Sequence, residues 1–158
     1  MVAALLTGCG SNGFQPMYAA SSFGGAGSKL AAVKITTIPG RVGQRIRNEL
    51  AFQSTGGGNA IAPTYKLNVT ITEQVTSTLV NAEGDSAGQI YQLDASFQLS
   101  DIKTGQVALN GQSFGRAGFE RFSSIFSNVR AREDAENRAA RTVANDIRVR
   151  LEAFLARG

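Results

Sequence analysis

The sequence predicts an α+β fold, a two-layer sandwich in which two helices cover one face of a four-stranded mixed sheet in the order β-α-β-β-β-α. Segments 65–74 and 91–100 alternate between apolar and polar residues, as strands with one buried face do. Segments 42–50 and 135–155 carry an apolar residue at every fourth position, as helices with one buried stripe do. Because each element has a single apolar side, both helices can pack on the same face of the sheet.

The first strand is expected at residues 29–38, KLAAVKITTI, with Val33 and Ile35 on one face. It ends at Pro39, and the first helix follows as far as the glycines at 56–58. The apolar stripe of this helix consists of Val42, Ile46 and Leu50. A right-handed crossover through the helix would set the first two strands parallel, which makes the sheet mixed.

The next three strands should form an antiparallel meander. The expected buried face of the first is Tyr65, Leu67, Val69 and Ile71. That of the second is Tyr91, Leu93, Ala95, Phe97 and Leu99. The turn DIKTG at 101–105 leads to a strand at 107–119, whose pattern slips near Gly111 in a way that a β-bulge would explain.

A long helix closes the chain from Asn128 onward, with Ser127 or Asn128 as its N-cap. Its apolar stripe consists of Ala135, Ala139, Val143, Ile147, Leu151 and Leu155. Carboxylates in the first turns of a helix complement its dipole. We therefore expect Glu133, Asp134 and Glu136 to be solvated rather than catalytic.

Composition excludes several classes of function. The chain has 158 residues, a net charge of +4, no histidine and one cysteine. Without histidine, the usual zinc ligand sets and every histidine-based catalytic triad are ruled out. No two carboxylates are placed as an acid and a base, and the charge is too low for a polybasic nucleic-acid binder. We expect a protein that is not an enzyme and uses no cofactor or metal.

One local charge asymmetry suggests a binding surface. Between residues 29 and 47 the sequence has no acidic residue but five basic ones, Lys29, Lys34, Arg41, Arg45 and Arg47. Such a group could bind lipid phosphates or an acidic strip on a partner, because guanidinium groups bind these oxygens bidentately. An ordinary solvated helix face explains the same residues.

The polar faces of the two clearest strands are rich in Thr, Asn, Gln and Ser. A sheet that faces water often carries more Lys and Glu, which discourage edge pairing. Neutral polar groups are easier to desolvate than charges, so this face could lie against a partner. It could equally face water, since Thr is favoured at exposed strand positions.

The start of the chain resembles a bacterial lipoprotein signal. LTGC at 6–9 resembles the lipobox, in which the cysteine is acylated and becomes the mature N-terminus. We favour lipidation of Cys9 over a buried thiol, because the Gly- and Ser-rich segment 10–28 is typical of a flexible tether. The expected organisation is a truncated signal peptide at 1–8, a lipidated tether at 9–28 and one domain at 29–158.

Beyond the lipobox, nearly the whole chain resembles LptE, a family of lipoproteins that take part in lipopolysaccharide assembly. The segments that carry the resemblance are GCGSNGFQPMY at 8–18, RVGQRIRNEL at 41–50, TYKLNV at 64–69, YQLDASFQLSDIKTGQV at 91–107 and VRAREDAENRAARTVANDIRVRL at 129–151. The family has a sheet with two helices, in agreement with the order expected above. The resemblance therefore implies the same fold.

The resemblance also implies a function. The protein would be anchored to the periplasmic side of the outer membrane by acyl chains, such as palmitate, on Cys9. It would plug the β-barrel LptD in a one-to-one complex, assist the assembly of that barrel and help transfer lipopolysaccharide to the outer leaflet. The alternative is a free-standing periplasmic lipoprotein that binds an amphipathic ligand or serves as an accessory subunit of a lipid exporter.

Overall fold

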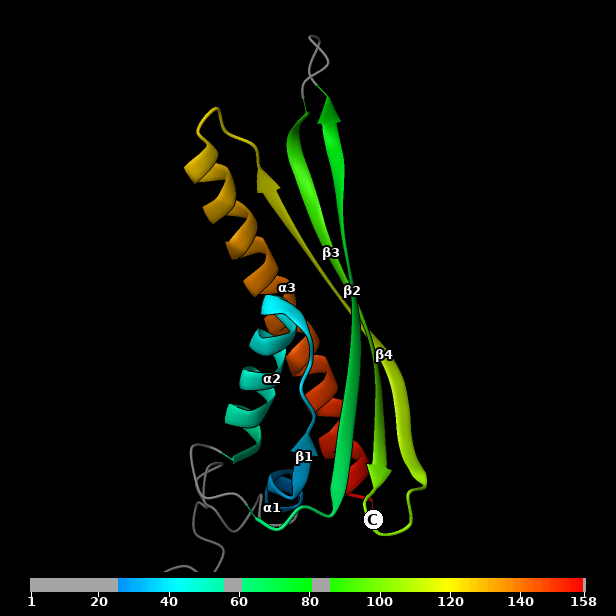
Figure 1. Ribbon diagram of the computed structural model, residues 1–158. Helices are drawn as coiled ribbons and strands as arrows, with labels where there is room; N and C mark the ends of the chain where they lie inside the picture. Colours follow the sequence, from blue (N-terminus) through cyan, green and yellow to red (C-terminus); the bar gives the residue numbers. More distant parts are fainter. Residues whose placement is uncertain (1–25, 56–60, 81–85, 158) are drawn as a thin grey trace, which may run out of the picture.

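The computed structural model describes residues 26–55, 61–80 and 86–157, which form one sheet covered by helices. The elements in chain order are α1 (Ala26–Ala31), β1 (Val33–Ile35), α2 (Gly40–Thr55), β2 (Tyr65–Val80), β3 (Ser86–Asp101), β4 (Val107–Glu120) and α3 (Ile125–Leu155) (Figure 1). The strand order is β1-β2-β3-β4, with β1 parallel to β2 and the other pairs antiparallel. The predicted α+β fold with a mixed sheet is confirmed.

The prediction of a strand over residues 29–38 is wrong at both ends. Residues 29–31 belong to the short helix α1, and β1 has only three residues. Lys, Leu and Ala favour helix, whereas the β-branched residues begin only at Val33. The chain leaves the sheet at Thr36, whose backbone N–H and hydroxyl both donate to the carbonyl of Leu67 at 3.0 Å.

Helix α2 occupies the predicted segment and packs as its stripe requires. Val42, Ile46 and Leu50 are all buried, as expected. The helix begins at Gly40, whose φ of +80° is unfavourable for any residue with a Cβ. The chain therefore reverses direction at Gly40, between β1 and α2, and α2 runs back across the sheet.

The meander has the predicted alternation, but the predicted bulge is in the wrong place. Gly111 pairs regularly with Phe97, and the register shift lies where Leu99 pairs with Leu109 and Ser100 with Val107, which leaves Ala108 as the extra residue. A Cβ at position 111 would lie 2.6 Å from the ring of Phe97. The break in the apolar pattern at Gly111 therefore makes room for that ring.

Helix α3 begins earlier than predicted. Its N-cap is Ser124 rather than Ser127 or Asn128, and the Ser124 hydroxyl accepts a hydrogen bond from the backbone N–H of Ser127 at 3.4 Å. The side chain of Asn128 instead accepts from the N–H of Phe122 at 2.6 Å and donates to the carbonyl of the same residue at 2.8 Å. This pair of bonds fixes the connection between β4 and α3.

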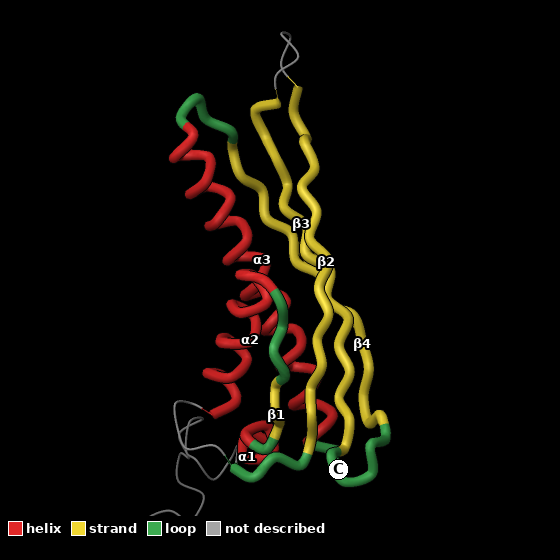
Figure 2. Tube along the Cα trace, viewed as in Figure 1, coloured by secondary structure: helices red, strands yellow, loops and turns green. Residues whose placement is uncertain are grey.

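The helices lie on one side of the sheet, and the other side is uncovered (Figure 2). We call the end that holds Val80 and Ile125 the tip, and the end that holds Tyr65, Asp101 and Leu155 the base. Helix α2 reaches only the base half of the sheet, and the β2–β3 hairpin continues past it to the tip (Figure 1). At about 3.4 Å per residue, the 16-residue strands β2 and β3 span roughly 50 Å.

Candidate functional site

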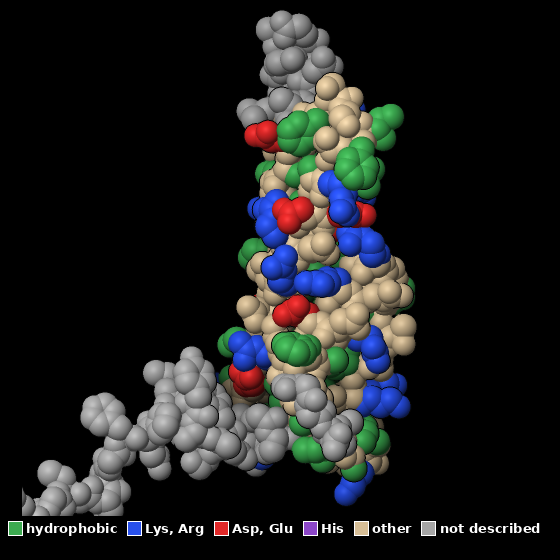
Figure 3. All heavy atoms as spheres, turned by 90° about the vertical axis from the view of Figure 1, so that its left-hand side faces the viewer, with side chains coloured by type: hydrophobic (Ala, Val, Ile, Leu, Met, Phe, Trp, Pro, Cys, Tyr) green, Lys and Arg blue, Asp and Glu red, His purple; other side chains and the backbone are tan. Residues whose placement is uncertain are grey.

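The five basic residues singled out in the sequence are not brought together as one cluster. Lys29 lies at the base, where its Nζ donates to the carbonyl of Leu155 at 3.0 Å. Arg41 and Arg45 lie on α2, and Lys34 and Arg47 are exposed on β1 and α2. Figure 3, which views the helix side, shows Lys and Arg side chains spread along the molecule with acidic groups among them.

Two of these cations are already paired with carboxylates. The Arg45 Nη2 lies 3.9 Å from the carboxylate of Glu49, one turn further along α2. Arg41 forms an ion pair with Glu136 of α3 and also donates to the side-chain oxygen of Asn137 at 3.3 Å. These pairs leave less positive charge for an external anion than the sequence indicates.

Glu136 is not a solvated carboxylate, contrary to the sequence-based prediction. It is 7% exposed and accepts hydrogen bonds from Arg41 of α2 and from Arg132 of its own helix, the latter at 2.8 Å. A buried carboxylate requires such partners, because an unpaired one is costly to desolvate. The three side chains connect α2 to α3 beside the sheet.

A second polar contact, between Glu73 and Tyr91, was missed by the sequence analysis. Tyr91 is fully buried, and its hydroxyl donates to the Glu73 carboxylate at 2.7 Å. Burial and this carboxylate raise the pKa of Tyr91, while the guanidinium groups of Arg132 and Arg41 act in the opposite direction. The phenol therefore stays protonated and serves as a hydrogen-bond donor. Glu73 lies on the same strand face as Val69 and Ile71, which was the available signal.

The uncovered side of the sheet, which we call the open face, is broad and largely neutral. Along its middle, Thr70, Ser96 and Gln112 lie side by side on three strands. Its charged residues, among those described, are Lys34, Lys66, Asp94, Arg116 and Glu120. Phe114 pairs with Asp94 and is 68% exposed, beside a shallow hollow of about 250 Å³. An exposed aromatic ring on a largely polar face suits contact with another molecule.

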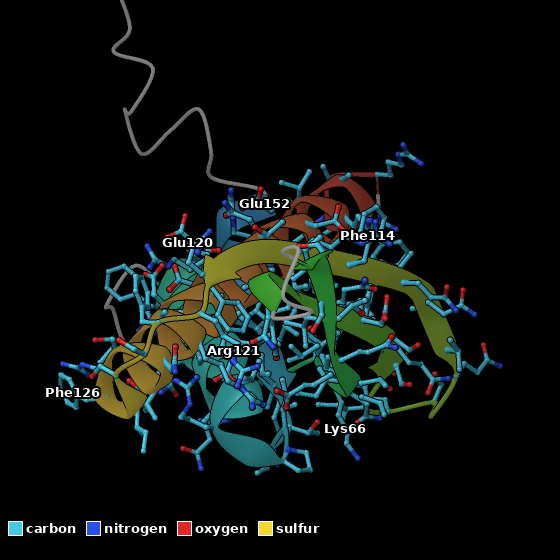
Figure 4. All side chains as sticks on the ribbon, turned by 90° about the horizontal axis from the view of Figure 1, so that it is seen from above. Lys66, Phe114, Glu120, Arg121, Phe126 and Glu152 are labelled. Atoms are coloured by element: carbon cyan, nitrogen blue, oxygen red, sulfur yellow. The ribbon has the colours of Figure 1, made fainter. Side chains whose placement is uncertain are left out.

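The tip carries an exposed apolar cluster, which the sequence analysis also missed. Its members, here called the tip cluster, are Phe122, Ile125, Phe126 and Val129. Ile125 and Phe126 are 83% and 72% exposed, and the Arg130 guanidinium lies 5.8 Å from the Phe126 ring centre. Figure 4 shows Phe126 well apart from Phe114 of the open face. Contiguous exposed apolar groups of this kind mark interaction sites.

No family model and no curated protein matches the chain. Solved structures do share its fold. A candidate lipoprotein from Caulobacter crescentus superimposes with a TM-score of 0.68 at 19% identity, covering 85% of this chain and 98% of its own. Rare lipoprotein B from Shewanella oneidensis gives 0.60 at 10% identity, covering 79% and 96%. The minor lipoprotein from Acinetobacter baumannii gives 0.53 at 12%, covering 77% and 90%.

At these identities the likeness establishes the fold alone, and this is a fold found among bacterial lipoproteins. Cys9 and the tether at 10–28 fall almost entirely outside the described residues, although α1 begins at Ala26. None of the described helices is long and apolar enough to cross a membrane. Within the same residues no cluster of three or more potential metal ligands is found.

Proposed function

We propose that the protein is an outer-membrane lipoprotein, acylated at Cys9, that occupies the lumen of the β-barrel LptD in a one-to-one complex. There it assists the assembly of the barrel and the transfer of lipopolysaccharide to the outer leaflet. The fold expected from the LptE resemblance is the one observed, and the solved structures that share it include rare lipoprotein B and other lipoproteins. This agreement supports the proposal at the level of the fold.

The observation that carries the proposal is the surface of the long hairpin. Strands β2 and β3 extend roughly 50 Å, and a bilayer with its headgroups is about 40–45 Å thick. An element of this length can follow a barrel wall through the membrane. Its open face is mostly neutral and polar, so its burial against a hydrated barrel wall costs less than the burial of charges would.

The edge of the sheet beside the open face is only partly protected. The bulge at Ala108 interrupts it, and Arg138 donates to the carbonyl of Gly118 at 2.8 Å. Strand β4 is an edge strand of 14 residues, and Phe114 projects from its outer face. Long exposed edges are normally protected, because they pair with other chains. A partner that covers this edge and the open face would add to that protection, and the inner wall of a barrel can do so.

A photocrosslinking experiment tests the proposal. A photoreactive amino acid is placed at Ser96 or Phe114 on the open face, and at Ala153 near the base of α3 as the control. In native cells we expect the first two positions to crosslink to one large outer-membrane barrel, and Ala153 to crosslink to it much less. If the open-face positions capture no barrel and the lipoprotein is recovered alone, the protein is free-standing and the proposal is wrong.

A further inference from the structure

A pocket of about 580 Å³ opens at the base of the domain, away from the open face and the tip cluster. Four separate parts of the chain form it, namely α1, the start of β2, the β3–β4 turn and the end of α3. Its apolar lining consists of Ala32, Ile61, Tyr65, Phe154 and Leu155. Its polar lining consists of Lys29, Thr64, Asp101 and Lys103. Pockets of about 300–1,000 Å³ are typical of small-molecule sites.

The apolar wall is well defined. The rings of Tyr65 and Phe154 meet edge to face, with centroids 6.3 Å apart and planes at 84°. Leu155 and Ala32 are buried beside them, whereas Ile61 is 51% exposed. An alkyl chain laid along this wall would cover apolar surface that water now contacts, which favours binding.

The charges at the rim select an anion. The Lys29 ammonium has three N–H donors and uses one on the Leu155 carbonyl, and Lys103 is exposed in the turn. The Asp101 carboxylate adds a negative charge to the rim, but its oxygen is hydrogen-bonded within the β3–β4 turn. The carboxylate accepts from the backbone N–H groups of Thr104 and Lys103, both at 2.8 Å, which holds its pKa below the ordinary value. The rim thus carries two positive charges and one negative charge, and the negative group already accepts hydrogen bonds from the turn.

We propose that this pocket binds a single-chain anionic amphiphile, with the alkyl chain along Tyr65, Phe154 and Ile61 and the head group between Lys29 and Lys103. A free fatty acid and a phosphate-bearing single-chain lipid share this chemistry. The proposal does not depend on a barrel partner, because all its groups belong to this domain. It therefore stands or falls separately from the proposed function.

Isothermal titration calorimetry on the full chain tests the assignment, with each amphiphile kept below its micellar concentration. The probes are dodecanoate and dodecyl phosphate as anions, and dodecyltrimethylammonium as the cationic counterpart. We expect at least one anion to bind far more tightly than the cation. Affinity should rise roughly threefold to fourfold for each methylene added up to the length of the wall. The two anions distinguish a carboxylate from a phosphate source.

Lysine substitutions provide matched controls. Lys103→Gln should weaken binding about tenfold, since charge-assisted hydrogen bonds are stronger than neutral ones. Lys29→Gln should do the same, because glutamine keeps a donor for the Leu155 carbonyl but removes the charge. Lys66→Gln, on the open face beside Tyr65, should leave the affinity unchanged. Equal binding of the cationic probe, or equal effects at Lys103 and Lys66, would overturn the proposal.

Discussion

The carboxylate of Glu136 shows how a single residue can connect two elements of this fold. It is buried against Arg41, which comes from the start of α2, and Arg132, which lies one turn earlier on α3. Both arginines are about half exposed, so each could be solvated if the carboxylate were removed. The stabilisation therefore depends on the charge of Glu136 and on its two charge-assisted bonds.

We expect Glu136→Gln to lower the free energy of unfolding by about 1–2 kcal/mol, because the amide keeps the shape but loses the charge. The control is Glu133→Gln, whose carboxylate pairs with Arg130 at the surface and should contribute less than about 0.5 kcal/mol. Urea denaturation of both variants measures the difference. Equal losses would mean that the buried pair has no special role.

The raised pKa of Tyr91 predicts how the free energy of unfolding changes at alkaline pH. Its pKa is raised in the folded protein, so the contribution of its protonated form is complete below the ordinary tyrosine pKa of about 10. As pH rises above 10 the unfolded chain ionises first, and the free energy of unfolding falls. Tyr91→Phe should show a flatter decline between pH 9 and 11 in urea titrations. A decline as steep as that of the parent protein would contradict this assignment.

The two polar contacts, Glu73 with Tyr91 and Glu136 with its arginines, also show what the sequence could and could not reveal. Glu73 shares the strand parity of Val69 and Ile71, so its place on the helix-facing side was readable. Glu136 is spaced by four from Ala140 and Ala144, so the sequence does place it in line with small apolar residues of the last helix. Their partners were not readable, because Arg41 is 95 residues from Glu136 in the chain. Local patterns give the face of an element but not the neighbour across the core.

Among the elements, β4 and α3 approach each other closely at Gly115. A Cβ there would lie 2.6 Å from the backbone oxygen of Ala139. Ala139 and Ala140 are fully buried, so small residues on both elements allow this contact. A larger residue would have to push the helix off the sheet.

We therefore expect Gly115→Ala to destabilise the fold by about 1–3 kcal/mol, since backbone cannot move aside as a side chain can. Gly118→Ala on the same strand is the control, because the nearest atom to its added Cβ would be 3.9 Å away. Thermal and urea unfolding of the pair checks the prediction. A smaller effect at Gly115 than at Gly118 would show that α3 packs less closely than described.

At this scale the sequence predicted the type and order of the described elements except α1, which it missed, but not all their boundaries. Strict alternation in β2 and β3 and the fourfold spacing in α2 left little ambiguity. The first strand was overextended because residues 29–31, which favour helix, were grouped with the β-branched residues that begin at Val33. The N-cap was placed three or four residues late, at Ser127 or Asn128, since Ser124 is an equally suitable residue type and only the observed bond distinguishes it.

At the scale of the whole molecule, the domain has different chemistry at its two ends. The tip cluster lies within one short segment, so its residues were visible in the sequence, but nothing there showed that they remain exposed. The base pocket could not be predicted, because its lining comes from four parts of the chain. Only the folded chain brings Lys29 and Phe154 to the same opening.

The tip cluster provides a test of partner binding. Replacing Ile125 and Phe126 together by Ser should weaken association with the proposed barrel about tenfold, because exposed apolar patches mark interaction sites and these are the two most exposed side chains of the cluster. The matched control is Val149→Ser, which lies on the same helix and is 53% exposed. Quantitative co-purification from native membranes measures the effect. Equal recovery of barrel with both variants would exclude the tip cluster from the interface.

The central claim is that this protein is lipidated at Cys9 and functions inside the LptD barrel. Native mass spectrometry tests this claim most directly. The protein is purified with a C-terminal tag from membranes of its own cells. We expect one species that contains one copy of this chain, acylated at Cys9, and one copy of the LptD barrel. A chain recovered alone, with an unmodified Cys9 thiol, would contradict the account.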